Sequence, residues 1–293
     1  FSAFLSNEEY DKGDIDLVVA GTETGVMMVE AGANEVSEDL IADAIDWAYK
    51  AMQPAIKLQQ ELVKKVGVVA QEFELDLPNE AVQAEVDAWV DGKLGHNLRK
   101  DYPERNELVN SMKHDFHDAL EAKYTPEVYK DIKNEYDDAF TLAVHKDVRK
   151  GIIADGLRPD GRKLTDIRTL SSQVGVLPRV HGSSIFTRGM TQALNIVTLA
   201  PLSFSQIVDT MERDSERRYF HHYNAPGYTV GEVKRLGSPG RREIGHGYLA
   251  ERALTAVLPD EADFPYAIRS VTEIMSQNGS TSMAATCSSC LAL

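Results

Sequence analysis

The sequence predicts an α+β protein in which two regions of mixed strands and helices flank an all-helical region. Near the start, two β-rich runs at 14–20 and 26–30 enclose a glycine-rich turn, which is typical of a hairpin. Residues from about 70 to 150 show helical spacing, and beyond Gly151 short strand-like runs alternate with loops and helices. We therefore expect domains at 1–69, 70–150 and 151–293.

The first region should fold as a hairpin followed by a long helix. Ser37 is a suitable N-cap, Glu38 and Asp39 favour the positive end of the helix dipole, and the helical pattern ends near Gly67. An isolated hairpin is only marginally stable in water. We therefore expect further sheet residues to precede Phe1 in the natural protein.

The middle region should contain a helix that Pro78-Asn-Glu caps and that runs through Leu94, then helices over 104–123 and 125–150. In the last region we expect strands over 193–199 and 266–273. A helix over 241–257 should place Ile244, Leu249, Ala253 and Leu254 on one face. A small-residue helix begins near Ser282, and its pattern is still open at Leu293, so we expect the chain to continue.

Charge is divided unevenly along the chain. Residues 1–150 carry 32 acidic and 16 basic side chains, whereas residues 151–293 carry 14 and 15, and 13 of those 15 are arginines. An arginine-rich half can bind phosphates, which places an anion site in the second half. No apolar run approaches the roughly 20 residues of a membrane span. We therefore expect no membrane partner. The only two cysteines, Cys287 and Cys290, suit a reducing cytoplasm. They have the spacing of a redox or zinc pair, but without a second pair and in a small-residue helix we expect inert packing.

Two motifs have the composition of a phosphate site. The run Ser238-Pro-Gly-Arg-Arg-Glu-Ile-Gly-His-Gly247 places Arg241, Arg242 and His246 at the start of a helix, where N–H groups favour anions. The run Asn278-Gly-Ser-Thr-Ser-Met283 offers the hydroxyls of Ser280, Thr281 and Ser282 in a loop that enters a helix. The alternatives are a salt-bridged helix start and an ordinary Ser/Thr helix cap.

These motifs belong to an ordered series of blocks. The series includes Asp16-Leu-Val-Val-Ala-Gly-Thr22, Arg158-Pro-Asp-Gly-Arg162, Phe186-Thr-Arg-Gly189 and His222-Tyr-Asn224. Together with the two anion motifs, it resembles the polynucleotide phosphorylase family of RNase PH-like proteins over nearly the whole chain. The resemblance implies two homologous β-α-β-α cores, both incomplete here, joined by a helical domain.

The resemblance also implies an activity. Members are phosphate-dependent 3′→5′ exoribonucleases that release nucleoside diphosphates from single-stranded RNA and polymerise them in the reverse reaction. In such a protein Arg241, Arg242 and His246 would be catalytic, and Ser280, Thr281 and Ser282 would bind phosphate. A homotrimeric ring with a central RNA channel, KH and OB-fold domains, and a helicase or endonuclease partner are further family expectations.

Arg179 and Arg188 are candidates for contacts to the RNA backbone, although either is equally consistent with an ordinary surface arginine. Met190, Ala225 and Gly227 depart from the residues that the family usually has, which affects local details of the RNA path. The run Arg217-Arg-Tyr-Phe220 suits either a basic–aromatic RNA patch or a half-buried strand.

The resemblance implies Mg²⁺ or Mn²⁺ held by a Gly-Asp-x-Asp-x-Lys block late in the second core. Such a block is absent after Gly151, so we expect the ligands beyond Leu293 and an inactive 293-residue chain. The equivalent first-core positions are Asp14 and Asp16, with Val18 in place of the lysine and Tyr10 in place of an upstream aspartate. We expect this first core to be a structural relic and its carboxylates to be a solvated strand entry.

Two other classes of function stay open at this point. A non-catalytic RNA-binding ring or scaffold subunit of the same fold would share most of the motifs. An acidic helical adaptor without an RNA role would leave Arg241, Arg242 and His246 unexplained.

Overall fold

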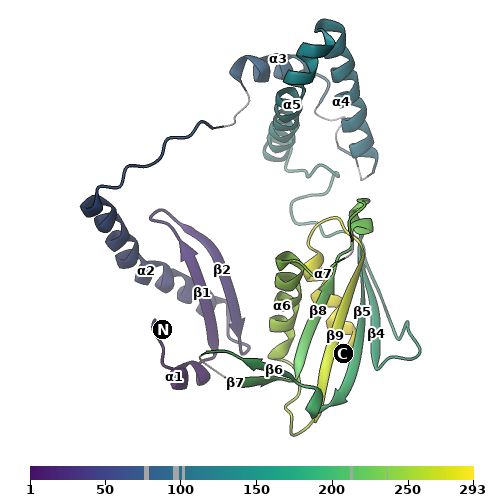
Figure 1. Cartoon of the computed structure of the whole chain (residues 1–293). Coiled ribbons are helices and arrows are strands. Elements are labelled where there is room, and N and C mark those ends of the chain that lie inside the picture. Colours follow the sequence, from purple (N-terminus) through teal and green to yellow (C-terminus); the bar gives the residue numbers. More distant parts are fainter. Residues whose placement is uncertain (76–78, 95–98, 101–102, 212–213, 236) are drawn as a thin grey trace. The chain divides into compact units, whose positions relative to one another are not determined.

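The computed structural model of the chain describes residues 1–75, 79–94, 99–100, 103–211, 214–235 and 237–293. These residues form two compact units (Figure 1). One unit combines Phe1–Val69 with Arg168–Leu293, and the other is Ala70–Ile167. The second unit extends past residue 150 because its last helix runs to Asp155 and a loop follows.

The N-terminal segment is the predicted hairpin and helix, preceded by a short helix that the sequence analysis missed. Strands β1 (Ile15–Gly21) and β2 (Val26–Ala33) pair antiparallel. The hydroxyl of Ser37 accepts the N–H of Leu40 at the start of α2 (Glu38–Val66), which ends at Gly67 in a left-handed conformation. The short helix is α1 (Asn7–Asp11), which begins with a capping box.

The helical unit consists of α3 (Glu80–Val90), α4 (Glu104–Lys123) and α5 (Pro126–Asp155). Asn79 caps α3 by accepting the N–H of Ala81, whereas Pro78 lies outside the described residues. Phe116 and Phe140 are the largest of the fully buried side chains that the structure describes, and their rings stack with centroids 5.7 Å apart. None of the helices that the structure describes is long and apolar enough to cross a membrane.

A five-stranded sheet forms the centre of the other unit. Its strand order is β3-β4-β5-β9-β8, and all neighbours are antiparallel except β8 and β9. The strands are β3 (Leu170–Val174), β4 (Gly182–Arg188), β5 (Thr191–Pro201), β8 (Tyr219–Asn224) and β9 (Tyr266–Ser276).

Smaller elements connect the strands of this sheet, and two helices lie over it. The connections include two 3₁₀ helices, η2 (Leu202–Phe204) and η3 (Gly227–Val230). They also include a two-stranded ribbon of β6 (Gln206–Asp209) and β7 (Asp214–Arg217). Helices α6 (Arg241–Thr255) and α7 (Thr281–Ala292) pack together and against the sheet (Figure 1).

The predicted apolar face of α6 is largely wrong. Ile244, Leu249 and Ala253 are exposed, and only Leu254 is buried as expected. The buried side instead carries Gly247, Ala250, Glu251 and Leu254. These positions have helical spacing, but two are small and one is charged, so hydrophobicity alone does not mark them.

The core between the sheet and α7 contains a polar network centred on Asn195, which is fully buried. Its amide nitrogen lies 2.9 Å from Ser270 Oγ, 2.8 Å from Thr272 Oγ1 and 2.9 Å from Ser289 Oγ. His221 joins the network through Nε2, which lies 2.8 Å from Thr272 Oγ1. These bonds connect β5, β8 and β9 to α7 and satisfy polar groups that would be costly to bury alone.

Two further expectations from the sequence concern residues 217–220 and the two cysteines. Tyr219 is buried in β8, Arg217 pairs with Glu251, and Arg218 donates to the carbonyls of Phe264 and Pro259. Arg217 ends β7 and Tyr219 begins β8, so the run 217–220 joins two strands, and both of its arginines contact groups of the protein itself. The expected packing of Cys287 and Cys290 is wrong, because both are free thiols on the exposed side of α7.

Candidate phosphate-binding site

Three predicted site residues meet where the first turns of α6 and α7 adjoin. Arg242 Nε donates to His246 Nε2 over 3.3 Å, one helical turn further along α6. His246 Nδ1 forms a short hydrogen bond with Ser282 Oγ, in the first turn of α7. The guanidinium, the imidazole and the hydroxyl are thus connected in one chain, which we call the Arg242–His246–Ser282 cluster.

Glycine at position 247 allows α6 to lie close enough to β8 for this cluster to form. A Cβ atom at Gly247 would lie 2.8 Å from the carbonyl oxygen of His221, closer than a side chain tolerates. The next inward residue of β8, Tyr223, stacks on the His246 ring with centroids 4.9 Å apart. Tyr223 also donates from its hydroxyl to Thr281 Oγ1 over 2.6 Å, so it contacts both helices.

The contacts of His246 determine its neutral tautomer. Since Arg242 Nε–H is a donor, His246 Nε2 must accept, and the ring proton is then on Nδ1. Nδ1–H donates to Ser282 Oγ, which leaves the hydroxyl proton of Ser282 for another acceptor. Burial, and to a lesser degree the positive charge of Arg242, lower the pKa of His246 and favour this neutral form.

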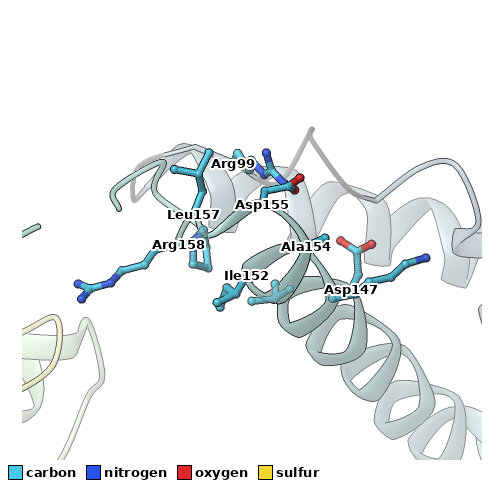
Figure 2. A pocket seen from close by; sticks show the side chains of 11 residues that line it. Arg99, Asp147, Ile152, Ala154, Asp155, Leu157 and Arg158 are labelled. Atoms are coloured by element: carbon cyan, nitrogen blue, oxygen red, sulfur yellow. The ribbon is translucent and has the colours of Figure 1, made fainter. Parts of the chain in front are cut away.

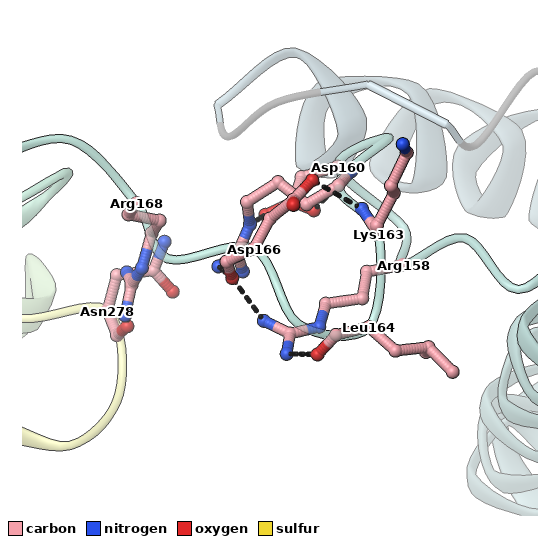
Figure 3. A network of polar contacts seen from close by, with 8 residues as sticks. Arg158, Asp160, Lys163, Leu164, Asp166, Arg168 and Asn278 are labelled. Carbon is pink, nitrogen blue, oxygen red and sulfur yellow. Dashed lines mark hydrogen bonds and ion pairs between the residues drawn. The ribbon is translucent and has the colours of Figure 1, made fainter.

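Two arginines and a threonine donate hydrogen bonds to the backbone carbonyls of the loop that enters α7. Arg188 Nη2 donates to the carbonyls of Gly279 and Ser280 over 3.1 and 3.0 Å, and Arg168 Nη1 donates to that of Asn278 over 2.8 Å. Thr191 Oγ1 donates to the Gly279 carbonyl over 3.1 Å. Arg168 and Asn278 are drawn in Figure 3.

The backbone of the same loop adopts left-handed conformations. Gly279 has φ +80°, and Ser280 has φ 48° and ψ 50°, which is uncommon for a residue with a side chain. A left-handed residue followed by the helical Thr281 turns successive N–H groups toward one side, which forms an anion-binding nest. N–H groups in the first turn of α7 have no acceptor within the helix and are available to a ligand.

The structure does not gather all the predicted site residues. Arg241 is exposed at the start of α6, and Thr281 is buried with its hydroxyl bonded to Tyr223. Arg179 is exposed in the loop before β4, whereas Arg188 ends β4 beside the loop that enters α7. At about 3.3 Å per residue β4 spans roughly 20 Å, and the two arginines lie toward its opposite ends.

Sequence reasoning missed Tyr223 as a site residue. The signal available was the alternation of Tyr219, His221 and Tyr223, which places all three on the helix-covered face of an edge strand. A hollow of about 600 Å³ opens beside this strand and the first turns of α6. Its lining includes Tyr223, Glu243 and Arg269, and its volume is in the range of small-molecule sites.

Comparison with known proteins identifies the family. A model described as 3′ exoribonuclease family, domain 1, matches residues 166–293, and one described as 3′ exoribonuclease family, domain 2, matches residues 5–51. This chain belongs to the 3′ exoribonuclease family. Domain 2 precedes domain 1 along the chain, which agrees with the end of one core followed by the start of another, separated by the helical unit.

Relatives within the family carry the name polyribonucleotide nucleotidyltransferase, and the resemblance stated from the sequence is confirmed. The protein of Halothermothrix orenii is 45% identical over 98% of this chain and 41% of its own length. Those of Natranaerobius thermophilus and Listeria welshimeri are each 43% identical over 98% of this chain, and over 41% and 40% of their own lengths. The chain thus spans about two fifths of the length of these relatives.

The two first-core carboxylates of this family member differ in their surroundings. Asp16 accepts from Arg252 Nη2 over 2.6 Å and from the Tyr10 hydroxyl over 2.8 Å, so the expectation of a solvated carboxylate is wrong for Asp16. Asp14 is exposed, as expected. Across the described parts of the chain, no group of three His, Cys, Asp or Glu side chains is placed to hold a metal ion.

The helical unit of this family member has a smaller pocket of about 250 Å³ at the C-terminal end of α5 (Figure 2). Arg99 and Asp155 form an ion pair on its wall. Arg158, which also lines this pocket, donates to the carbonyls of Leu164 and Asp166 and closes a compact loop (Figure 3). The first arginine of the Arg158-Pro-Asp-Gly-Arg162 block therefore supports this loop.

Proposed function

We propose that this chain contributes the phosphate site of a phosphate-dependent 3′→5′ exoribonuclease that shortens single-stranded RNA and releases nucleoside diphosphates. The observation that carries the proposal is the Arg242–His246–Ser282 cluster at the adjoining first turns of α6 and α7. In reverse, the reaction polymerises nucleoside diphosphates and releases phosphate. That direction fits the nucleotidyltransferase name of the relatives.

In the proposed reaction an oxygen of inorganic phosphate bonds to the phosphorus of the last phosphodiester. The bond from that phosphorus to the 3′ oxygen of the preceding nucleotide breaks, and this oxygen takes up a proton to become the new 3′ hydroxyl. Charge is spread over phosphoryl oxygens throughout, so the protein's contribution is positioning and electrostatic stabilisation.

Each member of the cluster has a distinct part in this proposal. Arg242 donates to phosphate oxygens from its exposed guanidinium, with Arg241 adding charge beside it. Ser282 donates its free hydroxyl proton, because His246 Nδ1–H already occupies the oxygen as an acceptor. Thr281 contributes its backbone N–H rather than its hydroxyl, which is bonded to Tyr223, and Ser280 supplies the left-handed turn.

The Mg²⁺ or Mn²⁺ expected from the resemblance remains a proposal for the whole protein. The described residues offer no ligand set for such an ion, and Asp16 is already paired with Arg252. We assign no step of the reaction to a metal held by this chain. Four further proposals come from the resemblance: RNA contacts of Arg179 and Arg188, a homotrimeric ring, association with other RNA-degrading proteins and a cytoplasmic location.

The test uses the intact protein, poly(A) and Mg²⁺, with and without inorganic phosphate. We expect ADP to appear only with phosphate, and Ser282→Ala to raise the KM for phosphate more than it weakens RNA binding. Release of AMP without phosphate would contradict the phosphorolytic reaction. RNA binding with no nucleotide release under either condition would instead favour the non-catalytic scaffold of the same fold.

A further inference from the structure

Helix α6 is fixed at its C-terminal half by charged side chains that reach two different elements. Glu251 is buried and accepts both Arg217 Nη2, over 2.8 Å, and the backbone N–H of His221, over 3.0 Å. The next residue, Arg252, points to the β1–β2 hairpin instead. Its Nη2 lies 2.6 Å from Asp16 Oδ2, and its Nη1 lies 3.4 Å from Glu30 Oε1.

The hairpin surrounds this guanidinium closely. Asp16 pairs in register with Gly32, and Glu30 lies two residues before Gly32, so both carboxylates occupy the same face of the ribbon. A Cβ on Gly32 would lie 3.6 Å from Arg252 Cζ, which places the guanidinium over Gly32 and within reach of both carboxylates. The Tyr10 hydroxyl donates to Asp16, and the Tyr248 ring centroid lies 4.8 Å from Cζ.

The same helix carries the anion-binding side chains. Arg252 lies six positions after His246, which is roughly 9 Å along a helix axis. An α-helix transmits a displacement of one end to the other because its backbone hydrogen bonds are continuous. A shift at Arg252 would therefore change the separation of His246 from Ser282, which belongs to a different helix.

We infer that Arg252 is a positioning residue for phosphate. By binding Asp16 and Glu30, it holds α6 where Arg242 and His246 meet Ser282, so the β1–β2 hairpin of the first core supports the anion site of the second. This inference rests on the proposed function and gives the hairpin carboxylates a part in it. The two carboxylates hold an arginine of the chain itself as their cation.

The experiment compares intact wild-type protein with Arg252→Ala, Asp16→Asn and the double variant. We expect Arg252→Ala and Asp16→Asn each to raise the KM for phosphate about three- to tenfold, with less change in kcat and in RNA affinity. The double variant should be no worse than Arg252→Ala alone, because both changes break one interaction. The exchanged pair Asp16→Arg with Arg252→Asp should recover part of the loss.

Lys50→Ala is the matched control, since it breaks an exposed ion pair with Asp46 on α2 and should leave the phosphate KM unchanged. Thermal unfolding of each variant establishes folding, and Arg252→Lys replaces Arg252→Ala if the latter does not fold. A phosphate-dependent wild type with an unchanged KM in folded Arg252 and Asp16 variants would overturn this inference alone. A wild type without phosphate dependence would overturn the proposed function.

Discussion

The imidazole of His246 stacks on the phenol of Tyr223, with ring centroids 4.9 Å apart and planes inclined by 18°. The same tyrosine donates to Thr281, so one side chain of β8 contacts both His246 of α6 and the first residue of α7. The stack also shields one face of the imidazole from water, and burial is the main cause of the lowered pKa of His246.

Two substitutions of Tyr223 distinguish the effect of its ring stack with His246 from that of its hydrogen bond to Thr281. Tyr223→Phe keeps the stack and removes the bond to Thr281, for which a cost of about 1 kcal/mol is expected. Tyr223→Leu removes both and should reduce kcat/KM for phosphorolysis several-fold further. Phosphate titrations of both intact variants measure the difference. Equal effects of the two substitutions would contradict a role for ring stacking.

Arg242→Ala should have the largest effect among the arginines of α6. It removes charge-assisted bonds to phosphate and the bond to His246, for which about 1.5–3 kcal/mol is expected, a roughly tenfold to hundredfold loss of kcat/KM. Arg241→Ala is the control and should cost less, because Arg241 is not part of the Arg242–His246–Ser282 cluster. A larger loss in Arg241→Ala would show that the anion binds on the outer side of the helix.

Arg188→Ala and Arg179→Ala should differ in what they change. Arg188 holds the carbonyls of Gly279 and Ser280, so its loss should loosen the loop that enters α7 and raise the KM for phosphate. Arg179 is exposed at the other end of β4, and any effect should be limited to salt-dependent RNA binding. Fluorescence anisotropy with labelled RNA at two salt concentrations, alongside phosphate kinetics, distinguishes these outcomes. An Arg188→Ala variant with weaker RNA binding and normal phosphate KM would assign this arginine to the RNA backbone.

Stability should fall below neutral pH because of His221. Burial lowers the pKa of this histidine to about 4 from an ordinary value of 6.5. The unfolded chain therefore takes up a proton between these values that the folded chain does not, and stability present above pH 6.5 is lost as pH falls toward 4. From pH 7 to pH 5 the loss should be about 2 kcal/mol.

His221→Gln isolates this contribution from neighbouring groups. Burial raises the pKa of Glu251, which has the opposite effect on stability, and lowers that of His222, which adds to the loss. Urea unfolding of both proteins at pH 7 and pH 5 gives the comparison. If the variant loses as much stability as the wild type, His221 is not the titrating group.

Local signals were enough for most of the elements. Ser37 and Gly67 marked the ends of α2, and the turn at Asn278 and Gly279 marked the entry into α7, because caps and turns depend on neighbouring residues. The motif order gave the family, and with it Arg242, His246 and Ser282, which the structure brings together.

Contacts between distant parts of the chain could not be predicted in the same way. Asp16 and Arg252 are 236 residues apart, and neither has a neighbour in sequence that indicates the other. The buried side of α6 could not be predicted from hydrophobicity. Gly247 faces inward because only a glycine fits beside the His221 carbonyl, and Glu251 faces inward because it pairs with Arg217. Tyr223 was missed because its role depends on two helices that follow it.

The amide of Asn195 carries two protons but lies within bonding distance of three hydroxyl oxygens. At least one acceptor must share a proton or turn elsewhere, so the surrounding hydroxyls can exchange partners without any change of backbone. Loss of the Ser270 hydroxyl leaves two acceptors for the two amide protons, but it also removes the donor to Asn195 Oδ1, which lies 3.2 Å away. The asparagine, whose amide makes all three contacts, is therefore the group on which the network depends most.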